Sequence, residues 1–145
     1  MRVAFLSGLG RLDASEARQV HPLALAYLGD AVFELYVRDR LLAGVALPAA
    51  ELHRQAVMRV RATAQAFVLR ACLDELTDDE ADVVRRARNA RCSSYRHVDS
   101  ADYHYSTAFE ALLGYLYLLG CEERLEQLME VAFEMADQRE NGGEH

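Results

Sequence analysis

Apolar residues recur every three or four positions along most of this chain, which is the period of an α-helix. The periodic stretches cover roughly residues 22–43, 48–58, 62–73, 78–90, 103–119 and 121–136. None of them shows the strict alternation of a half-buried strand, and no two-residue hairpin turn separates apolar runs. The pattern predicts one all-α domain over residues 1–145, in which about residues 137–145 form a polar, disordered tail.

Local signals set the expected helix ends. Asp13 with Glu16, and Thr77 with Glu80, have the spacing of capping boxes. Pro22 is expected to open a long helix that ends before Gly44, and Pro48 to open the next one. Residues 91–103 contain serines and charges without apolar periodicity, which predicts a loop of functional length.

Two nearly uncharged helical stretches each contain one carboxylate. Asp30 is the only Asp, Glu, Lys or Arg between Arg18 and Glu34, and Glu110 is the only acid between Asp102 and Glu122. An ionised carboxylate in low-dielectric surroundings is costly unless a cation or hydrogen bonds compensate it. A buried arginine partner would explain Asp30 and hydrogen bonding would explain Glu110, but the two together favour a hard divalent cation such as Mg²⁺.

Glu34 follows Asp30 by one helical turn, so the two carboxylates lie on one stripe of the helix. They are close enough to share a cation. Glu34 is also four residues before Arg38, which is the spacing of an ordinary surface ion pair. Both interpretations stay open, and Glu34 is retained as a candidate for catalytic support.

Cysteine and histidine spacing excludes several other classes of site. Cys72, Cys92 and Cys121 form no C-x-x-C pair, and the five histidines show neither zinc-site spacing nor the Glu-x-x-His pairs of di-iron bundles. The longest apolar run, residues 111–121, is too short to span a bilayer, and no secretory segment opens the chain. These features predict a soluble cytoplasmic protein without a membrane partner.

The net charge of −7 is unevenly distributed. Residues 120–145 contain eight acids and two arginines, whereas residues 85–96 contain no acid and five arginines: Arg85, Arg86, Arg88, Arg91 and Arg96. Any one of these would be unremarkable on a solvated helix face. As a cluster they are candidates for contacts to RNA phosphates, which arginine binds well, and Arg54, Arg59 and Arg61 are candidates to extend that surface.

Two motifs resemble those of a known family. Residues 25–32, LAYLGDAV, resemble the L-E-F-L-G-D-A signature of ribonuclease III, and residues 109–114, FEALLG, resemble its second acidic motif. Similarity to the Mini-III group extends over about residues 15–130 and includes RRARNAR at 85–91. The resemblance implies an all-helical, homodimeric, Mg²⁺-dependent endonuclease that cuts double-stranded RNA, leaving 5′-phosphate and 3′-hydroxyl ends.

The resemblance also assigns roles by position. Asp30 and Glu110 match the catalytic, metal-binding acids, and Tyr27 matches the aromatic that contacts the partner subunit. Asp99 is similar in position to a Mini-III loop aspartate that would support catalysis, although a plain loop acid or helix cap is an equal alternative. Ribonuclease III itself has further acids where this chain has Ala26 and Thr107, which leaves the number of ions and the full ligand set open.

The implied biological role is trimming of large-subunit (23S) ribosomal RNA precursors, in some members stimulated by a ribosomal protein. Mini-III enzymes have no separate double-stranded-RNA-binding domain, and none is expected within these 145 residues. The alternative is a catalytically inactive module of the same fold that binds structured RNA during ribosome assembly.

Overall fold

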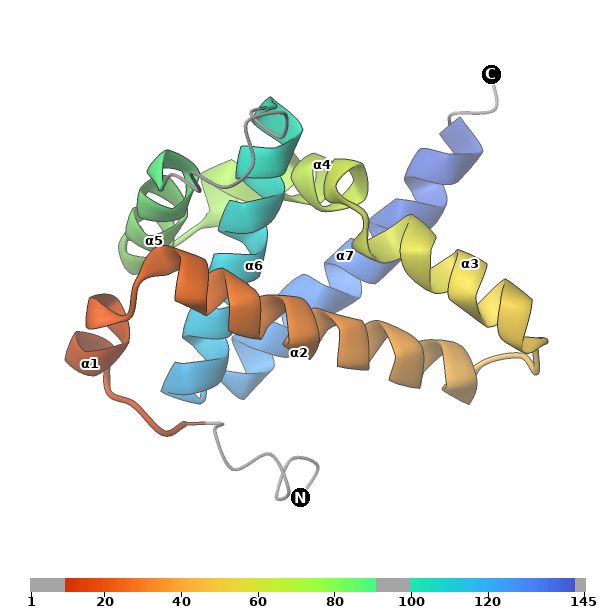
Figure 1. Cartoon of the computed structure of the whole chain (residues 1–145), viewed down its shortest axis with the longest axis horizontal. Helices are drawn as coiled ribbons and strands as arrows, with labels where there is room; N and C mark the ends of the chain where they lie inside the picture. The colour runs from red at the N-terminus through yellow and green to blue at the C-terminus, as the bar shows by residue number, and fades with distance from the viewer. Residues whose placement is uncertain (1–9, 91–99, 143–145) are drawn as a thin grey trace.

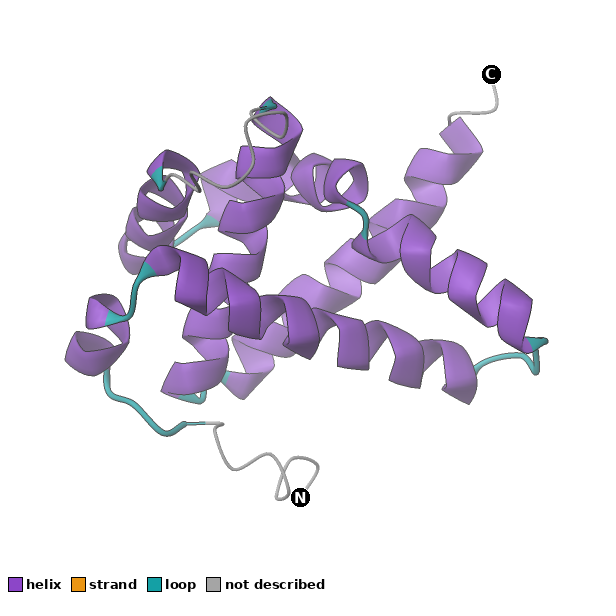
Figure 2. Ribbon diagram, viewed as in Figure 1, coloured by secondary structure: helices purple, strands orange, loops and turns teal. Residues whose placement is uncertain are grey.

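The described part of the protein, residues 10–90 and 100–142 of a computed structural model, is built from helices and short connections (Figures 1 and 2). In chain order these are α1 (Ala14–Gln19), α2 (Pro22–Ala43), α3 (Ala49–Val60), α4 (Ala62–Cys72), the 3₁₀ turn η1 (Leu73–Glu75), α5 (Asp78–Asn89), α6 (Ala101–Leu119) and α7 (Glu122–Gly142). No strand occurs in those ranges, which confirms the predicted all-α class. None of the described helices has the length and apolar character needed to cross a membrane.

Several predicted helix ends are confirmed by their caps. Asp13 and Thr77 both form complete capping boxes, and Pro22 is the first residue of α2. The side chain of Ser100 accepts a hydrogen bond from the Tyr103 backbone and so begins α6 at Ala101. Residues 101–103, expected in the preceding loop, are therefore helical, while residues 91–99 lie outside the described part.

The last helix is longer than the sequence pattern predicts. We expected it to end near Ala136 and a disordered tail to follow, but α7 continues to Gly142. Asp137 forms an ion pair with Arg59, whose side chain is only 4% exposed and stacks on the ring of Phe133 at 4.1 Å. This contact between α3 and α7 lies just beyond Ala136, where the sequence pattern predicted the helix to end.

The core is organised around α6. Every residue from Ala111 to Leu118 is buried, and α2, α4, α5 and α7 all pack against this helix. The most extensive contact is with α2, which crosses α6 in Figure 1. The rings of Phe33 and Phe109 meet edge to face at 5.7 Å in this crossing. Such an apolar helix is stable only when neighbours cover it on nearly all sides.

The arginine-rich helix α5 is fixed to α7 by an ion pair in the core. Glu80 is 4% exposed and accepts two hydrogen bonds from Arg124, at 3.0 Å from Nε and 2.9 Å from Nη2. Glu80 also caps the backbone of Thr77. Both of its carboxylate oxygens therefore have partners within the chain, as a buried charge requires.

Candidate active site

The crossing of α2 and α6 is a direct contact between backbones. A Cβ added to Gly29 would lie 1.7 Å from the carbonyl oxygen of Glu110, and one added to Gly114 would lie 2.1 Å from that of Leu25. No side chain fits at either position, so two glycines allow the helices to approach this closely. Because Asp30 follows Gly29 directly, the contact also brings Asp30 beside Glu110.

The two predicted acids are therefore adjacent. Their carboxyl groups lie within hydrogen-bonding reach of each other. Asp30 is exposed and Glu110 is half-buried, so the expectation of a low-dielectric setting for both is wrong for Asp30. A stretch without charged neighbours in sequence can still face solvent, because a helix has several faces. Within the described residues, no arginine forms an ion pair with either acid, and the arginine-partner alternative for Asp30 is not supported.

This arrangement changes the protonation of Glu110. Desolvation, followed by the charge of Asp30 and the hydrogen bond to it, raises the pKa of Glu110 to about 8. A hydrogen bond from Gln65 opposes the rise. Near neutral pH Glu110 consequently tends to keep its proton unless a cation is bound beside it.

Gln65 is a site residue that the sequence analysis missed. It lies on α4, is 1% exposed, and donates hydrogen bonds from Nε2 to Oε2 of Glu110 at 3.3 Å and to the backbone oxygen of Val60 at 2.8 Å. The available signal was a single amide within the otherwise apolar run of residues 64–69, AQAFVL. A polar side chain in a buried stretch indicates a specific partner.

The donor set fits a hard divalent cation. Two carboxylates in contact, with no compensating positive side chain among the described residues, provide the oxygen ligands and negative charge that Mg²⁺ prefers. No group of three or more His, Cys, Asp or Glu side chains suited to metal binding occurs in residues 10–90 and 100–138. Ala26 and Thr107 are both buried, so the remaining ligands of such an ion would be water and substrate phosphate.

The two candidates for catalytic support have different positions. Glu34 forms the ion pair with Arg38 at 3.1 Å, through Oε1, and its Oε2 is buried without a hydrogen-bond partner in the described part of the chain. Asp99 lies outside the described residues. Neither is therefore placed in contact with the Asp30 and Glu110 pair by the structure.

The predicted RNA-binding arginines lie around the end of α5 as far as the structure describes them. Arg85 pairs with Asp82 at 2.5 Å, Arg86 is half-buried, and Arg88 stacks on the ring of Tyr105 at 4.5 Å. Arg91 and Arg96 lie outside the described residues. Arg70 of α4 stacks on the same Tyr105 ring at 4.4 Å, so two guanidinium groups meet there.

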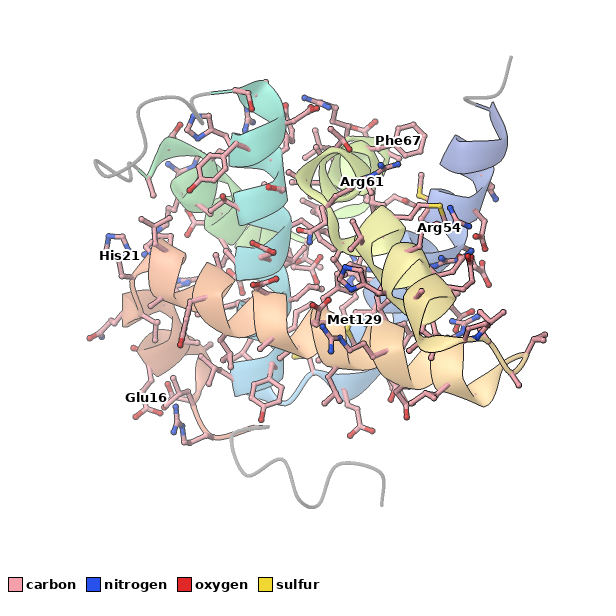
Figure 3. All side chains as sticks on the ribbon, turned by 45° about the vertical axis from the view of Figure 1, so that its right-hand side comes forward. Glu16, His21, Arg54, Arg61, Phe67 and Met129 are labelled. Carbon is pink, nitrogen blue, oxygen red and sulfur yellow. The ribbon has the colours of Figure 1, made fainter. Side chains whose placement is uncertain are left out.

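Of the three arginines predicted to extend the RNA-binding surface, one is unsuitable. Arg59 is buried in its contacts with Asp137 and Phe133, so it cannot reach a phosphate backbone. Arg54 and Arg61 are exposed and, with Phe67, lie along α3 and α4 in Figure 3. Tyr27, the predicted dimer contact, is 85% exposed on α2, three residues before Asp30.

Comparison with known proteins agrees with this geometry. The Ribonuclease III domain family matches residues 23–120, a region that contains both crossing helices. A Mini-ribonuclease 3 of Symbiobacterium thermophilum is 50% identical over 112 residues, which cover 77% of this chain and 86% of the relative. One from Thermoanaerobacter sp. is 38% identical over 137 residues, covering 94% of this chain and 96% of the relative. The crystal structure of a Fusobacterium nucleatum protein is similar with a TM-score of 0.73 and 27% identity, over 81% of this chain and 94% of that one.

The fold is thus that of a ribonuclease III domain, and the matched region includes the helix crossing at which the two acids lie. The chain belongs to the Mini-ribonuclease 3 family, which confirms the resemblance seen in its motifs, and it is an endoribonuclease. Enzymes with this domain are generally dependent on a divalent metal and act on RNA.

Proposed function

We propose that the protein is a Mg²⁺-dependent endonuclease that hydrolyses double-stranded RNA, with Asp30 and Glu110 as the residues that hold the ion. The observation that carries the proposal is the contact between these two carboxylates without a cation from the described chain. When bound, the ion supplies activation of a water molecule and stabilisation of the leaving oxygen. Water adds to phosphorus, the bond to the 3′ oxygen breaks, and 5′-phosphate and 3′-hydroxyl ends result.

The two acids have different tasks in this proposal. Asp30 is exposed and available to a bound phosphodiester, whereas Glu110 is half-buried and held from behind by Gln65. The backbone contact at Gly29 and Gly114 keeps them together without any mobile side chain between them. Such preorganisation lowers the cost of assembling the site at the moment of reaction. Glu34 and Asp99 remain candidates for catalytic support.

The arginines around α5 are proposed to bind the RNA backbone: Arg85, Arg86, Arg88, Arg91 and Arg96. The stack of Arg88 on Tyr105 at 4.5 Å supports this, because it holds a guanidinium group beside α6, where Arg70 stacks on the same ring and pairs with Asp102. Recognition would depend on the shape, phosphates and 2′-hydroxyls of an A-form duplex more than on its sequence.

We also propose that the protein acts as a homodimer, with Tyr27 in the interface. The proposal rests on the position that Tyr27 shares with the interface aromatic of ribonuclease III, and its ring, 85% exposed, is available for contact with a second copy. A two-fold dimer would present the same surface twice and so offer one site to each strand of a duplex.

The substrate proposed is the precursor of large-subunit (23S) ribosomal RNA, with stimulation by a ribosomal protein and a cytoplasmic location as further parts of the proposal. The test is to incubate the purified protein with precursor ribosomal RNA, with Mg²⁺ or with EDTA, and to map the ends formed. We expect discrete cuts within duplex regions only when Mg²⁺ is present. Binding of the RNA without cleavage would instead favour the inactive ribosome-assembly module.

A further inference from the structure

Gln65 is a neutral polar side chain in a place where packing alone would favour an apolar one. It is 1% exposed, and its neighbours on α4 include Ala64, Ala66 and Leu69, all buried. A leucine or methionine would fill a similar volume without any need for hydrogen bonds. A buried amide at this position therefore needs an explanation in terms of its partners.

Both hydrogens of the amide nitrogen have partners. Nε2 donates to the backbone oxygen of Val60 at 2.8 Å and to Oε2 of Glu110 at 3.3 Å. Val60 is the last residue of α3, where backbone oxygens have no helical partner, so this bond fixes the amide at the corner between α3 and α4. Because both partners are acceptors, the amide cannot be turned over, and Oε1 must be the remaining group.

That remaining oxygen is buried and has no hydrogen-bond partner in the part of the chain that the structure describes. Buried acceptors are rarely left unsatisfied, and water is the usual partner when the protein provides none. A hydrated Mg²⁺ ion retains several water molecules, all of which are hydrogen-bond donors. The oxygen belongs to the same amide that contacts one of the two proposed ligands.

We propose that Gln65 is a positioning residue for the metal-binding carboxylates. This inference rests on the proposed function. The amide nitrogen holds Oε2 of Glu110 against α4, which leaves the other carboxylate oxygen for the ion beside Asp30. The amide oxygen accepts a hydrogen bond from water of the ion's hydration shell. Residues that orient metal ligands in this way typically change metal affinity 10- to 100-fold when they are substituted.

The test is a titration of the full chain with Mg²⁺ alone, without RNA, followed by nuclear magnetic resonance. Gln65→Met has a similar size but removes both the donor and the acceptor. We expect its Mg²⁺ affinity to fall about 10- to 100-fold. The matched control is Gln55→Met on α3, which removes an amide that donates to Glu51 at 2.8 Å and accepts from Arg59 at 2.7 Å, with no hydrogen bond to either acid of the site. An unchanged affinity in Gln65→Met would overturn the proposal, and so would an equal loss in the control.

A cleavage assay separates positioning from a general structural role. In Gln65→Met, the Mg²⁺ concentration for half-maximal cleavage should rise, and the rate at saturating Mg²⁺ should largely recover. A purely structural role would lower the unfolding temperature and leave that concentration unchanged. If the wild-type protein itself neither bound Mg²⁺ nor cut RNA, the proposed function would fail. Wild-type activity with a fully active Gln65→Met would refute only the assignment of Gln65.

The wild-type protein provides a second measurement if Gln65→Met does not fold. In ¹⁵N-labelled protein, the side-chain amide resonances of Gln65 should shift during the Mg²⁺ titration with the same midpoint as the backbone resonance of Glu110. Those of Gln55 should stay unchanged. A Gln65 amide that does not respond to Mg²⁺, while the Glu110 backbone does, would contradict the proposal.

Discussion

Glu80 and Glu110 are both removed from solvent, but they have opposite surroundings. Glu80 accepts two hydrogen bonds from Arg124 and one from the backbone of Thr77. Burial alone raises the pKa of Glu80, but these bonds outweigh it and the pKa is lowered. Glu110 has a second acid, Asp30, as its neighbour, and its pKa is raised to about 8.

The difference separates a charge that is paired within the protein from the charge that we propose holds the metal ion. The charge of Glu80 is paired with Arg124, and this ion pair joins α5 to α7. Glu110 is left with an uncompensated neighbour, which destabilises the folded protein unless a cation or a proton intervenes. Burial of an acid is therefore weak grounds for assigning function, whereas its partner is strong grounds.

Removal of either acid of the pair should have the largest effect. Asp30→Asn and Glu110→Gln keep the shape of the site but remove a charge, and we expect cleavage of duplex RNA to fall at least a hundredfold, beyond the usual effect of substituting a residue behind the ligands. The measurement is the initial rate with Mg²⁺ and a labelled duplex. Glu80→Gln is the matched control and should cut normally when it is folded. Full activity in Asp30→Asn would show that the Asp30 and Glu110 pair does not carry the catalysis.

Replacing a glutamate by glutamine should affect the stability of the folded protein differently at the two positions. Glu80→Gln removes the partner of Arg124, and we expect the free energy of unfolding to fall by about 2 kcal/mol, less than for a fully buried pair because the Arg124 side chain is 26% exposed. Glu110→Gln should be neutral or stabilising, because it relieves the repulsion by Asp30. Urea unfolding without metal measures both. If Glu110→Gln lowered the free energy of unfolding more than Glu80→Gln, Glu110 rather than Glu80 would be the stabilising acid.

The pH dependence of stability should also differ in sign. The pKa of Glu110 is raised from 4.5 to about 8, so between these values the folded state holds more protons than the unfolded state. The free energy of unfolding then falls as pH rises, by up to about 1.4 kcal/mol per pH unit. Glu80, with its lowered pKa, stabilises above pH 4.5 and loses this as pH falls through its folded-state pKa.

The variants assign each part of this profile. Unfolding in EDTA across pH 3 to 8 should show a decline above about pH 5 that is missing in Glu110→Gln and present in Glu80→Gln. Saturating Mg²⁺ should flatten the wild-type decline. A wild-type profile that rises throughout that window would contradict the raised pKa of Glu110.

The smallest effect is expected from the arginine surface, which lies outside the comparison of the two glutamates. Substitution of Arg85, Arg86 and Arg88 by alanine should weaken RNA binding and reduce the salt dependence, by roughly 0.7–0.9 in the slope of log K against log salt for each lost phosphate contact. Arg18→Ala, an exposed arginine paired with Asp79, is the control. An unchanged slope in the triple variant would move the RNA surface elsewhere.

Local signals predicted much of the fold. Capping residues such as Asp13 and Thr77 act within one turn, and their helices begin where expected. The predicted end of α7 near Ala136 was wrong, and just beyond it Asp137 pairs with Arg59, 78 residues earlier in the chain. Contacts of that kind leave no trace in periodicity.

The site was predictable only in part for the same reason. Asp30 and Glu110 are recognisable from their motifs, but the solvent exposure of Asp30 depends on which face of α2 remains uncovered. Gln65 and Glu110 are 45 residues apart in sequence, so the sequence could not predict the hydrogen bond between them.

The close contact of Gly29 with the backbone of Glu110 makes the proposed site depend on folding. The acids meet only when α2 and α6 close on each other, and these helices form the most extensive contact in the core. If the two acids form the site as proposed, a chain in which α2 and α6 have not closed on each other lacks it. On heating, the proposed activity should be lost at or below the temperature at which the crossing of α2 and α6 unfolds.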